Sequence, residues 1–391
     1  MFVRKAEPAL ELDEMEIIFW LCLGVILYVY FGYPLLLVSG LLGRRRPIQK
    51  AHYFPSLSVI VPARNEEANI RKKLENLLSQ DYPAEKMKIL VGDDGSTDGT
   101  TAICRSFEPI GVKFFRAEVG RGKSALQNEL VARAHGEILV FTDADCLLPQ
   151  NALSVIAQNF ASNDVALVTN CATILNQAET GIVKGEGMYW TYEKWLREEE
   201  SARGLLAMAS GSLFAMRRAF WKRLDPNVGD DFALPLLVAQ TGYRNVLETR
   251  VSAGTQLTQN QPDSMVRMKM RIISKDLYGL LRNPACLNPL QVGRVAISLW
   301  SHKLLRWAIP YFLVGLLISN IFLAGETFYG VFLAAQAAFY LAAAAGLLIR
   351  GLESRFPLSV TSSFCVVNFA SLLGTLHCLT SGKAGQWKTV R

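Results

Sequence analysis

The sequence has few of the residues that build metal centres or disulfide frameworks. Its 391 residues include seven cysteines and four histidines, and no two cysteines form a Cys-x-x-Cys pair. This scatter favours a reducing compartment and argues against structural zinc. Helix-turn-helix, RNP and finger patterns are also absent, although the formal net charge is +7. Because basic residues cluster beside apolar runs, we assign the excess charge to membrane orientation and expect no nucleic-acid partner.

Apolar residues make up 51% of the chain and gather near its two ends. The first run, residues 17–42, is about long enough to cross a bilayer, and three arginines at 44–46 follow it. An acidic flank precedes the run, so the charge asymmetry predicts an external N-terminus and a cytoplasmic domain after the helix. A signal peptide is the alternative. The length of the run and the lack of a cleavage site argue against it.

Three further apolar runs, at 304–324, 327–349 and 357–378, follow the middle region. A short Gly-Glu turn joins the first two into a helical hairpin. The third contains several polar residues, so it either spans or lies at the interface; we expect the second, because the basic tail at 383–391 then stays inside. The expected domains are an N-terminal tail and helix (1–46), a globular domain (47–290), and an interfacial helix with C-terminal membrane helices (291–391).

Short β-rich runs alternate with helical stretches from residue 56 onward. Three of them are 57–61, 88–91 and 138–141. This alternation predicts an α/β, Rossmann-like fold with a mostly parallel sheet. Each run leads into a polar cluster, at 63–66, 93–94 and 143–145 respectively. Ligands bind at the carboxyl ends of parallel strands, so we expect these clusters to converge.

Asp143-Ala144-Asp145 follows the strand at 138–141 and has the form of a metal site. Two carboxylates flanking one small residue offer hard oxygen ligands for Mg²⁺ or Mn²⁺, which can neutralise a departing diphosphate. The alternative is a solvated acidic turn. The preceding apolar strand and the other acidic strand ends favour the metal site.

Two other clusters suit a nucleotide. Asp93 and Asp94 can accept hydrogen bonds from a base or a ribose, although a turn leading to a helix N-cap is the structural alternative. Gly120-Arg121-Gly122-Lys123 resembles an anion-binding loop but is not a Walker A motif.

Asp231, next to Asp230, is the candidate general base that deprotonates an attacking sugar hydroxyl. From the sequence alone, a helix N-cap at either aspartate is the competing interpretation. Further along, Arg267, Lys269 and Arg271 share a helical stretch that could meet donor phosphates or lipid headgroups. An interfacial amphipathic helix is the alternative there.

Five segments in this order resemble glycosyltransferase family 2 of the GT-A fold, specifically membrane-bound bacterial members related to polysaccharide synthases and poly-N-acetylglucosamine synthase. The resemblance covers nearly the whole chain. The segments are Val61–Glu66, Asp93–Asp98, Gly122–Lys123 with Asn128, Phe141–Asp145, and Gly211 before Phe214–Arg217.

The resemblance implies a role for each matching position. Donor contacts are expected from Pro62, Ala63, Asn65, Glu66, Asp93, Asp94, Lys123, Asp143 and Arg271. The metal is expected on Asp143 and Asp145, and the catalytic positions are Asp231 and Asp230. Gly211 and Trp190 are expected on the acceptor side.

One motif departs from the pattern of processive synthases. They carry Gln-x-x-Arg-Trp after the base, whereas Met268-Lys269-Met270-Arg271-Ile272 keeps only the arginine. The missing tryptophan removes a platform for the end of a growing glycan, so single-sugar transfer becomes at least as plausible as processive synthesis.

The sequence therefore predicts an inverting, metal-dependent glycosyltransferase at the cytoplasmic face of a bacterial inner membrane. The donor is a nucleotide sugar, with a UDP-sugar as the first choice, and the acceptor is lipid-linked or a polysaccharide. Membrane lipids and subunits of a synthase complex are the other expected partners. The alternatives are a non-catalytic nucleotide-sugar-binding or polysaccharide-binding subunit and a nucleotidyltransferase.

Overall fold

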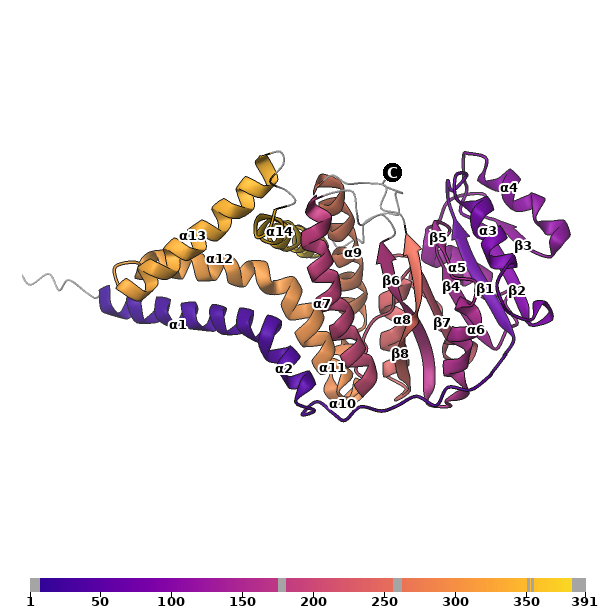
Figure 1. The fold of residues 1–391 in the computed structure, drawn as a ribbon, viewed down its shortest axis with the longest axis horizontal. Coiled ribbons are helices and arrows are strands. Elements are labelled where there is room, and N and C mark those ends of the chain that lie inside the picture. Colours follow the sequence, from indigo (N-terminus) through magenta and orange to yellow (C-terminus); the bar gives the residue numbers. More distant parts are fainter. Residues whose placement is uncertain (1–7, 175–180, 256–261, 350–351, 353–354, 382–391) are drawn as a thin grey trace, which may run out of the picture.

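The computed structural model describes residues 8–174, 181–255, 262–349, 352 and 355–381. A sheet with flanking helices forms one end of the molecule, and long apolar helices form the other (Figure 1). The helices α7 (Gly181–Arg203) and α9 (Pro262–Arg282) stand between these two parts. The sheet end and the apolar end therefore meet along α7 and α9.

The described residues form one eight-stranded sheet of order β3-β2-β1-β4-β7-β6-β8-β5. The contacts of β1 with β2 and β4, of β2 with β3, and of β6 with β8 are parallel. β7 runs antiparallel between β4 and β6, and β5 pairs antiparallel with β8. The strands are β1 Leu57–Ala63, β2 Met87–Asp93, β3 Lys113–Arg116, β4 Ile138–Thr142, β5 Cys146–Leu147, β6 Val165–Ile174, β7 Leu213–Arg217 and β8 Arg244–Thr255.

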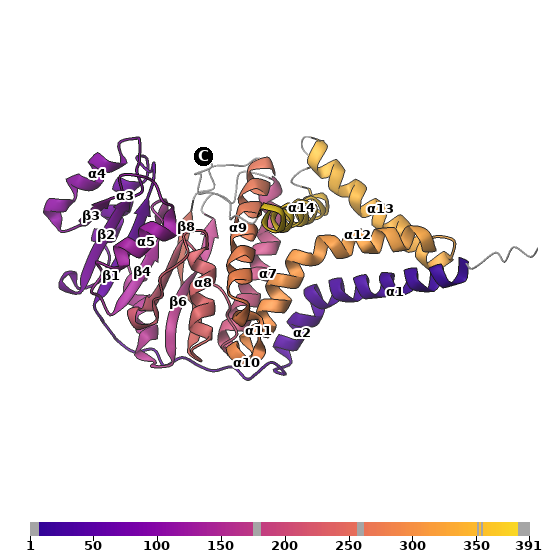
Figure 2. The same ribbon diagram turned by 180° about the vertical axis from the view of Figure 1, so that it is seen from behind.

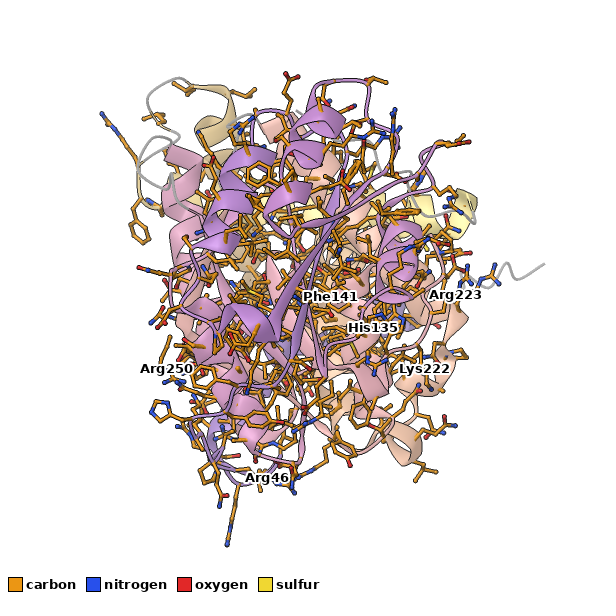
Figure 3. The ribbon with its side chains drawn as sticks, turned by 90° about the vertical axis from the view of Figure 1, so that its right-hand side faces the viewer. Arg46, His135, Phe141, Lys222, Arg223 and Arg250 are labelled. Atoms are coloured by element: carbon orange, nitrogen blue, oxygen red, sulfur yellow. The ribbon has the colours of Figure 1, made fainter. Side chains whose placement is uncertain are left out.

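Helices cover both faces of this sheet because alternate strand residues point to opposite sides. Val59 and Val61 of β1 pack in one apolar cluster with α3, α4 and α6, whereas Ile60 packs in a second cluster with α5 and α8. Phe141 lies near the middle of the sheet end in Figure 3, stacked between Phe214 and Trp221 at ring distances of 4.8 and 5.3 Å. The helices are α3 Ile70–Leu78, α4 Thr100–Ser106, α5 Lys123–Val131, α6 Ala152–Ala157 and α8 Asp230–Ala239.

The apolar end is built from four segments of the described chain that are long and apolar enough to cross a membrane. The first comprises α1 (Pro8–Leu27), a π-helical turn (Tyr28–Gly32) and α2 (Tyr33–Val38). After α10 (Pro289–Val292), the second comprises α11 (Val295–Ser298), another π-helical stretch (Leu299–Leu304) and α12 (Leu305–Leu323). The last two are α13 (Thr327–Leu348) and α14 (Leu358–Ser381).

The segments predicted at 304–324, 327–349 and 357–378 correspond to α12, α13 and α14. α14 appears end-on in both Figure 1 and Figure 2, so it runs across the direction of α1 and α12. It packs against α9 and α7 as well as α12 and α13. The basic tail at 383–391, on which its predicted placement depended, lies outside the described residues.

Candidate active site

The carboxyl ends of β1, β2 and β4 lie at one edge of the sheet. Ala63 at the end of β1 pairs in register with Asp93 at the end of β2, and β4 continues from Thr142 into Asp143. The three polar clusters predicted from the sequence therefore meet at this edge, as expected for parallel strands.

Lys123 links two of the predicted acidic groups. Its Nζ lies 2.8 Å from Asp143 Oδ1 and 3.4 Å from Asp230 Oδ1. Burial disfavours the charged ammonium, but the surrounding carboxylates, Asp143 first among them, hold the pKa of Lys123 above its usual value. The cation thus joins the turn after β4 to the start of α8.

The beginning of α5 fixes the loop before α8. Ser124 Oγ donates to the carbonyl of Val228 over 2.7 Å, and Gln127 Nε2 donates to Asp230 Oδ2 over 2.7 Å. Both oxygens of Asp230 are therefore occupied, by Lys123 and Gln127. Asp230 was expected as a catalytic position; its carboxylate holds Lys123 and Gln127, and its catalytic role stays a prediction.

Asp231 is half-buried in the first turn of α8. The N-cap is Gly229, so the competing interpretation of Asp230 or Asp231 as the cap is wrong. The amide of Ala209 donates to the Asp231 carbonyl over 2.8 Å, which brings the 209–211 segment alongside. A Cβ on Gly211 would lie 3.1 Å from Asp231 Oδ2 and 3.7 Å from Asp143 Oδ2.

The Gly211 backbone therefore fits between the predicted base and the predicted metal turn, in a space that a side chain would narrow. Burial, together with the negative charge of Asp230, raises the pKa of Asp231 to about 6. A carboxylate with that pKa is suited to general-base chemistry near neutral pH.

Asp145 lies on the exposed side of the turn. Loss of hydration, followed by the charges of Asp143 and Glu66, raises its pKa to about 6. Such crowding of carboxylates suits a divalent cation, which relieves their mutual repulsion. Within the described residues, no three His, Cys, Asp or Glu side chains form a metal-holding group. Asp143 and Asp145 are the residues that would hold a divalent metal ion at this turn.

Lys73, which sequence reasoning did not single out, lies beneath this turn. It is fully buried on α3, and its Nζ donates to Thr142 Oγ1 over 2.7 Å and to the Cys146 carbonyl over 2.5 Å. Burial lowers the pKa of Lys73 to about 8 despite the nearby Asp143 and Asp145 carboxylates. The sequence did hold a signal: Lys73 is on the apolar stripe formed by Ile70, Leu74 and Leu77.

The two predicted nucleoside-binding aspartates are fully buried and held by the chain around them. Asp93 accepts from the Ser96 amide and from the Thr101 hydroxyl. Asp94 accepts from the amides of Arg121 and Gly122, over 2.8 and 2.9 Å. Asp94 therefore shapes the predicted anion-binding loop.

The loop after β1 lies against the loop after β2. Asn65 adopts a left-handed backbone conformation (φ 53°), and its Oδ1 accepts from the Thr97 amide over 2.9 Å. The Glu66 amide donates to Thr100 Oγ1 over 2.8 Å. Pro62 and Ala63 are buried at the end of β1. These contacts fasten the β1 and β2 loops to each other.

The remaining predicted residues lie on the two upright helices. Arg271 of α9 is half-buried; burial lowers its pKa, while the charge of Asp143 opposes that change. Trp190 is half-buried on α7. Arg271 is thus within electrostatic range of the predicted donor site, and the described contacts leave the acceptor assignment of Trp190 as a prediction.

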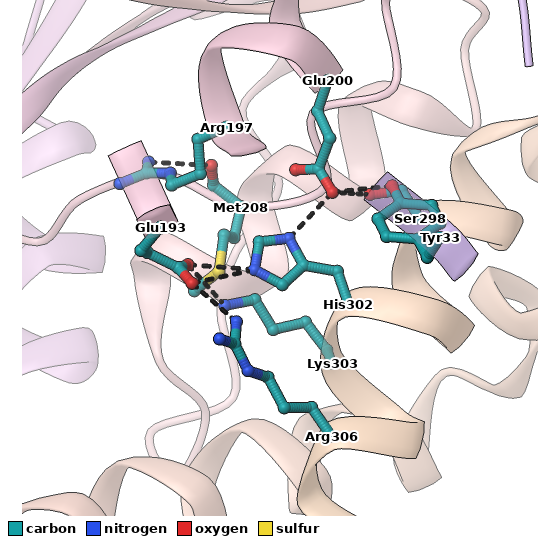
Figure 4. Close-up of polar contacts among 9 residues, drawn as sticks. All are labelled: Tyr33, Glu193, Arg197, Glu200, Met208, Ser298, His302, Lys303 and Arg306. Carbon is teal, nitrogen blue, oxygen red and sulfur yellow. Dashed lines mark hydrogen bonds and ion pairs between the residues drawn. The ribbon is translucent and has the colours of Figure 1, made fainter. Parts of the chain in front are cut away.

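A buried charge cluster joins α7 to the second apolar segment (Figure 4), and the sequence did not predict these contacts. His302 lies between two carboxylates of α7: its Nε2 is 3.0 Å from Glu193 and its Nδ1 is 2.8 Å from Glu200. Arg306 Nη1 donates to Glu193 over 2.7 Å, and Lys303 Nζ lies 3.5 Å from the same carboxylate. Although burial favours the neutral acid, these cations hold the pKa of Glu193 well below its usual value.

The same cluster also reaches the first apolar segment. Tyr33 and Ser298 donate their hydroxyls to Glu200 Oε1, over 2.8 and 2.7 Å. The Tyr28 and Ser301 hydroxyls are 2.7 Å apart. Glu200 of α7 therefore contacts both apolar segments next to their π-helical stretches.

Comparison with known proteins identifies similar chains. The family described as Glycosyl transferase family 2 matches residues 58–224. Beta-monoglucosyldiacylglycerol synthase of Synechocystis is 29% identical over 171 residues, which are 42% of this chain and 36% of that protein. The probable glycosyltransferase YdaM of Bacillus subtilis is 24% identical over 296 residues, covering 71% of this chain and 68% of YdaM.

A solved structure shares the fold almost completely. The mannosyltransferase PcManGT from Pyrobaculum calidifontis, in complex with GDP-Man and Mn²⁺, superposes with a TM-score of 0.69 and 22% identity. The similarity covers 95% of this chain and 100% of PcManGT. It confirms the predicted α/β fold of the GT-A type, with one refinement: the antiparallel β7 lies inside the sheet. The chain is therefore similar to Glycosyl transferase family 2 through residues 58–224.

Proposed function

We propose that this protein is an inverting, metal-dependent glycosyltransferase that moves one sugar from a nucleotide sugar to a hydroxyl of a lipid-linked or glycan acceptor. The observation that carries the proposal is the position of Asp231. It lies beside Gly211, next to the Asp143 carboxylate that Lys123 holds. A candidate base and a candidate diphosphate site thus face each other across one glycine.

The proposed reaction is a single displacement. The acceptor oxygen attacks the anomeric carbon as Asp231 takes the hydroxyl proton, and a new carbon–oxygen bond forms. The bond from the anomeric carbon to the phosphate oxygen breaks, and the nucleoside diphosphate leaves with the electron pair. Lys123 stabilises the growing negative charge, because its ammonium is already fixed at this edge of the sheet.

The metal is proposed for the Asp143 and Asp145 pair. A bound Mg²⁺ or Mn²⁺ would neutralise diphosphate charge there. Support comes from the crowded carboxylates and from the Mn²⁺ in the PcManGT complex. The nucleoside is proposed for the loops after β1 and β2. A UDP-sugar remains the first choice as donor.

A lipid-linked acceptor is supported by the position of the candidate site beside α9, which packs against the apolar α14. The name of the Synechocystis relative, Beta-monoglucosyldiacylglycerol synthase, points the same way. We place the sheet domain on the cytoplasmic side of a bacterial inner membrane, since arginines 44–46 follow the first apolar segment.

The test is a transfer assay on the full chain in detergent, with UDP-, GDP- and dTDP-sugars and detection of the released diphosphate. Asp231→Asn should lower turnover by about 10²-fold or more, because a general base contributes that much. Asp145→Ala should weaken Mn²⁺ binding measured by electron paramagnetic resonance, independently of turnover. Asp225→Asn, an exposed aspartate in the preceding loop, is the matched control.

Wild-type turnover in both active-site variants would refute the proposal. Donor binding without turnover in the wild type would instead favour a non-catalytic binding subunit. Release of pyrophosphate from a nucleoside triphosphate would favour a nucleotidyltransferase.

A further inference from the structure

A cavity of about 560 Å³ lies at the opposite end of the sheet from the candidate active site. Its walls include Leu57 at the start of β1, Lys88 near the start of β2 and Lys113 at the start of β3. These positions mark the amino ends of three parallel strands, whereas the candidate active site lies at carboxyl ends. β1 runs from Leu57 to Ala63, which separates the two sites by roughly 20 Å at the usual rise of a strand. Neither the sequence patterns nor the proposed function assigns this cavity a role.

One face of the two outer strands forms an apolar floor. Leu90 of β2 pairs with Lys113 of β3 in the parallel register. Alternate residues of a strand share a face, so Lys88 is on the same side as Leu90, and Phe115 is on the side of Lys113. Leu90, Leu130 of α5 and the half-buried Phe115 pack in one apolar cluster, and all three line the cavity. The floor therefore lies on the face of the sheet that α5 covers.

Positive charge surrounds this floor. Among the described residues, those that line the cavity include four Lys or Arg side chains and one acidic side chain, Glu85. Lys88 and Lys113 are exposed, and neither makes an ion pair or a side-chain hydrogen bond within the described part of the chain. They lie on the same face of neighbouring strands, where like charges repel each other. The side of the cavity that faces solvent therefore carries unpaired positive charge.

Arg133 places a third cation beside the aromatic ring. Its guanidinium lies over Phe115, with Cζ 4.3 Å from the ring centroid. Its Nη1 donates to the Glu129 carbonyl over 2.7 Å and lies 3.3 Å from Glu129 Oε2. Both contacts to Glu129 use Nη1, and a guanidinium has N–H donors on its other two nitrogens as well. The structure thus holds Arg133 in place and leaves donors for a ligand.

These features define the chemistry of a ligand. Sites for small molecules are ~300–1,000 Å³ in volume and mostly apolar, with a few polar groups that fix the orientation of the ligand. The apolar floor suits a flat ring. The cations around it suit a phosphate group, which carries about −1.5 to −2 charges and three acceptor oxygens. A carboxylate carries one charge and leaves more of the cations unpaired.

The position of the cavity selects a soluble source for that phosphate. β3 is the edge strand of the sheet, and β1 to β3 lie at the end of the molecule away from the apolar helices (Figure 1). The strands β7, β6 and β8 come between β4 and the upright helices α7 and α9, which meet the apolar end. Lipid headgroups beside the apolar helices therefore lie away from this cavity.

We propose that this cavity is a second ligand site, for a soluble phosphate ester of a flat aromatic group such as a nucleotide. The ring lies on the apolar floor beside Phe115, and the phosphate accepts hydrogen bonds from Lys88 and Lys113. The inference does not depend on the proposed function, because the two sites are at opposite ends of the strands.

The test is a calorimetric titration of the full chain in detergent with AMP, adenosine and inorganic phosphate. AMP should bind about tenfold or more tightly than either of the other two, because only AMP carries both the ring and the phosphate. The double variant Lys88→Gln with Lys113→Gln should weaken AMP binding about tenfold or more, because two charge-assisted hydrogen bonds to the phosphate are lost. Its Tm should stay near that of wild type, since exposed side chains without partners contribute little to stability.

The double variant Lys222→Gln with Arg223→Gln is the matched control. Both side chains are exposed, and neither is among the residues that line the cavity. The control removes the same amount of charge from the sheet domain, so it separates contact with the ligand from a general loss of positive charge. The Kd of AMP should stay within about twofold of wild type in this variant.

A photoreactive nucleotide, 8-azido-AMP, locates the site directly. On the full chain it should label peptides from β3 and from the end of α5 through His135, which lines the cavity. Labelling confined to the loops after β1 and β2 would place AMP in the candidate active site and overturn the inference. The inference would also fail if AMP did not bind, if it bound no more tightly than phosphate, or if the two double variants weakened its binding equally.

Discussion

Glu193 and His302 form a buried polar contact in which the ring Nε2 lies 3.0 Å from both carboxylate oxygens. The side chains are 9% and 2% exposed. Because Nδ1 of the same ring faces Glu200, both ring nitrogens of His302 meet carboxylates of α7. The junction between α7 and the second apolar segment is therefore held by charge rather than by apolar contact alone.

Removing one carboxylate from this junction should destabilise the whole chain. Glu193→Gln leaves the His302 ring and the cations of Lys303 and Arg306 without their shared carboxylate, and breaking a buried pair in this way costs about 3–5 kcal/mol. We expect Tm in detergent, followed by intrinsic fluorescence, to fall by several degrees.

Glu198→Gln is the matched control on the same helix. Its partner Lys194 is 3.8 Å away, and both side chains are well exposed. Exposed pairs contribute roughly 0–1 kcal/mol, so Tm should hardly change. Equal effects of the two variants would show that the buried cluster does not stabilise the junction.

The activity should depend on pH through Asp231. Burial and Asp230 raise its pKa to about 6. A general base acts only when ionised, so kcat/KM should rise as the pH increases through about 6 and level off above pH 7. The measurement is a rate profile from pH 5 to 8 at saturating Mn²⁺. In Asp231→Asn the residual rate should not show this rise with pH. If kcat/KM of the wild type instead rose with a midpoint below pH 5, that result would argue against Asp231 as the base.

Much of the fold could be predicted from local sequence patterns. The runs at 57–61, 88–91 and 138–141 became the cores of β1, β2 and β4, because buried parallel strands are continuous apolar runs. The antiparallel placement of β7 between β4 and β6 could not be predicted. It depends on pairings such as Phe141 with Phe214, which are 73 positions apart in the chain and leave no local trace.

The candidate site was predictable where it follows strands and not where it depends on distant pairing. Asp143 and Asp145 directly follow β4, so their position comes from the strand. Lys73 was missed, yet it interrupts an apolar helical stripe. A charged residue on such a stripe is a signal that can be searched for. The partners of His302 lie about a hundred residues away and had no comparable signal.

Lys73 should matter more for activity than for stability. Burying its ammonium is costly, as the lowered pKa of about 8 indicates, but its hydrogen bonds to Thr142 and to the Cys146 carbonyl fix both ends of the metal turn. We expect Lys73→Met to keep a Tm near that of wild type, because an apolar side chain of similar volume replaces a buried charge. Turnover should fall about tenfold or more through misplacement of the turn.

Lys72→Met, at the adjacent exposed position, should leave both properties unchanged. Wild-type turnover in Lys73→Met would mean that the turn does not need the cation.

The membrane placement of α14 leads to a prediction about the C-terminus. Its buried face carries several hydroxyl and amide side chains, among them Ser362, Asn368 and Thr375, and it lies across the direction of α1 and α12. A helix lying at the interface keeps both of its ends on one side of the membrane, whereas a spanning helix separates them. We therefore expect a reporter fused after Arg391 to lie in the cytoplasm. The measurement pairs an alkaline phosphatase fusion with a green fluorescent protein fusion in a bacterial host, and fusions in the turn between α12 and α13 serve as the external reference. Phosphatase activity with a dark fluorescent fusion at the C-terminus would show that α14 spans.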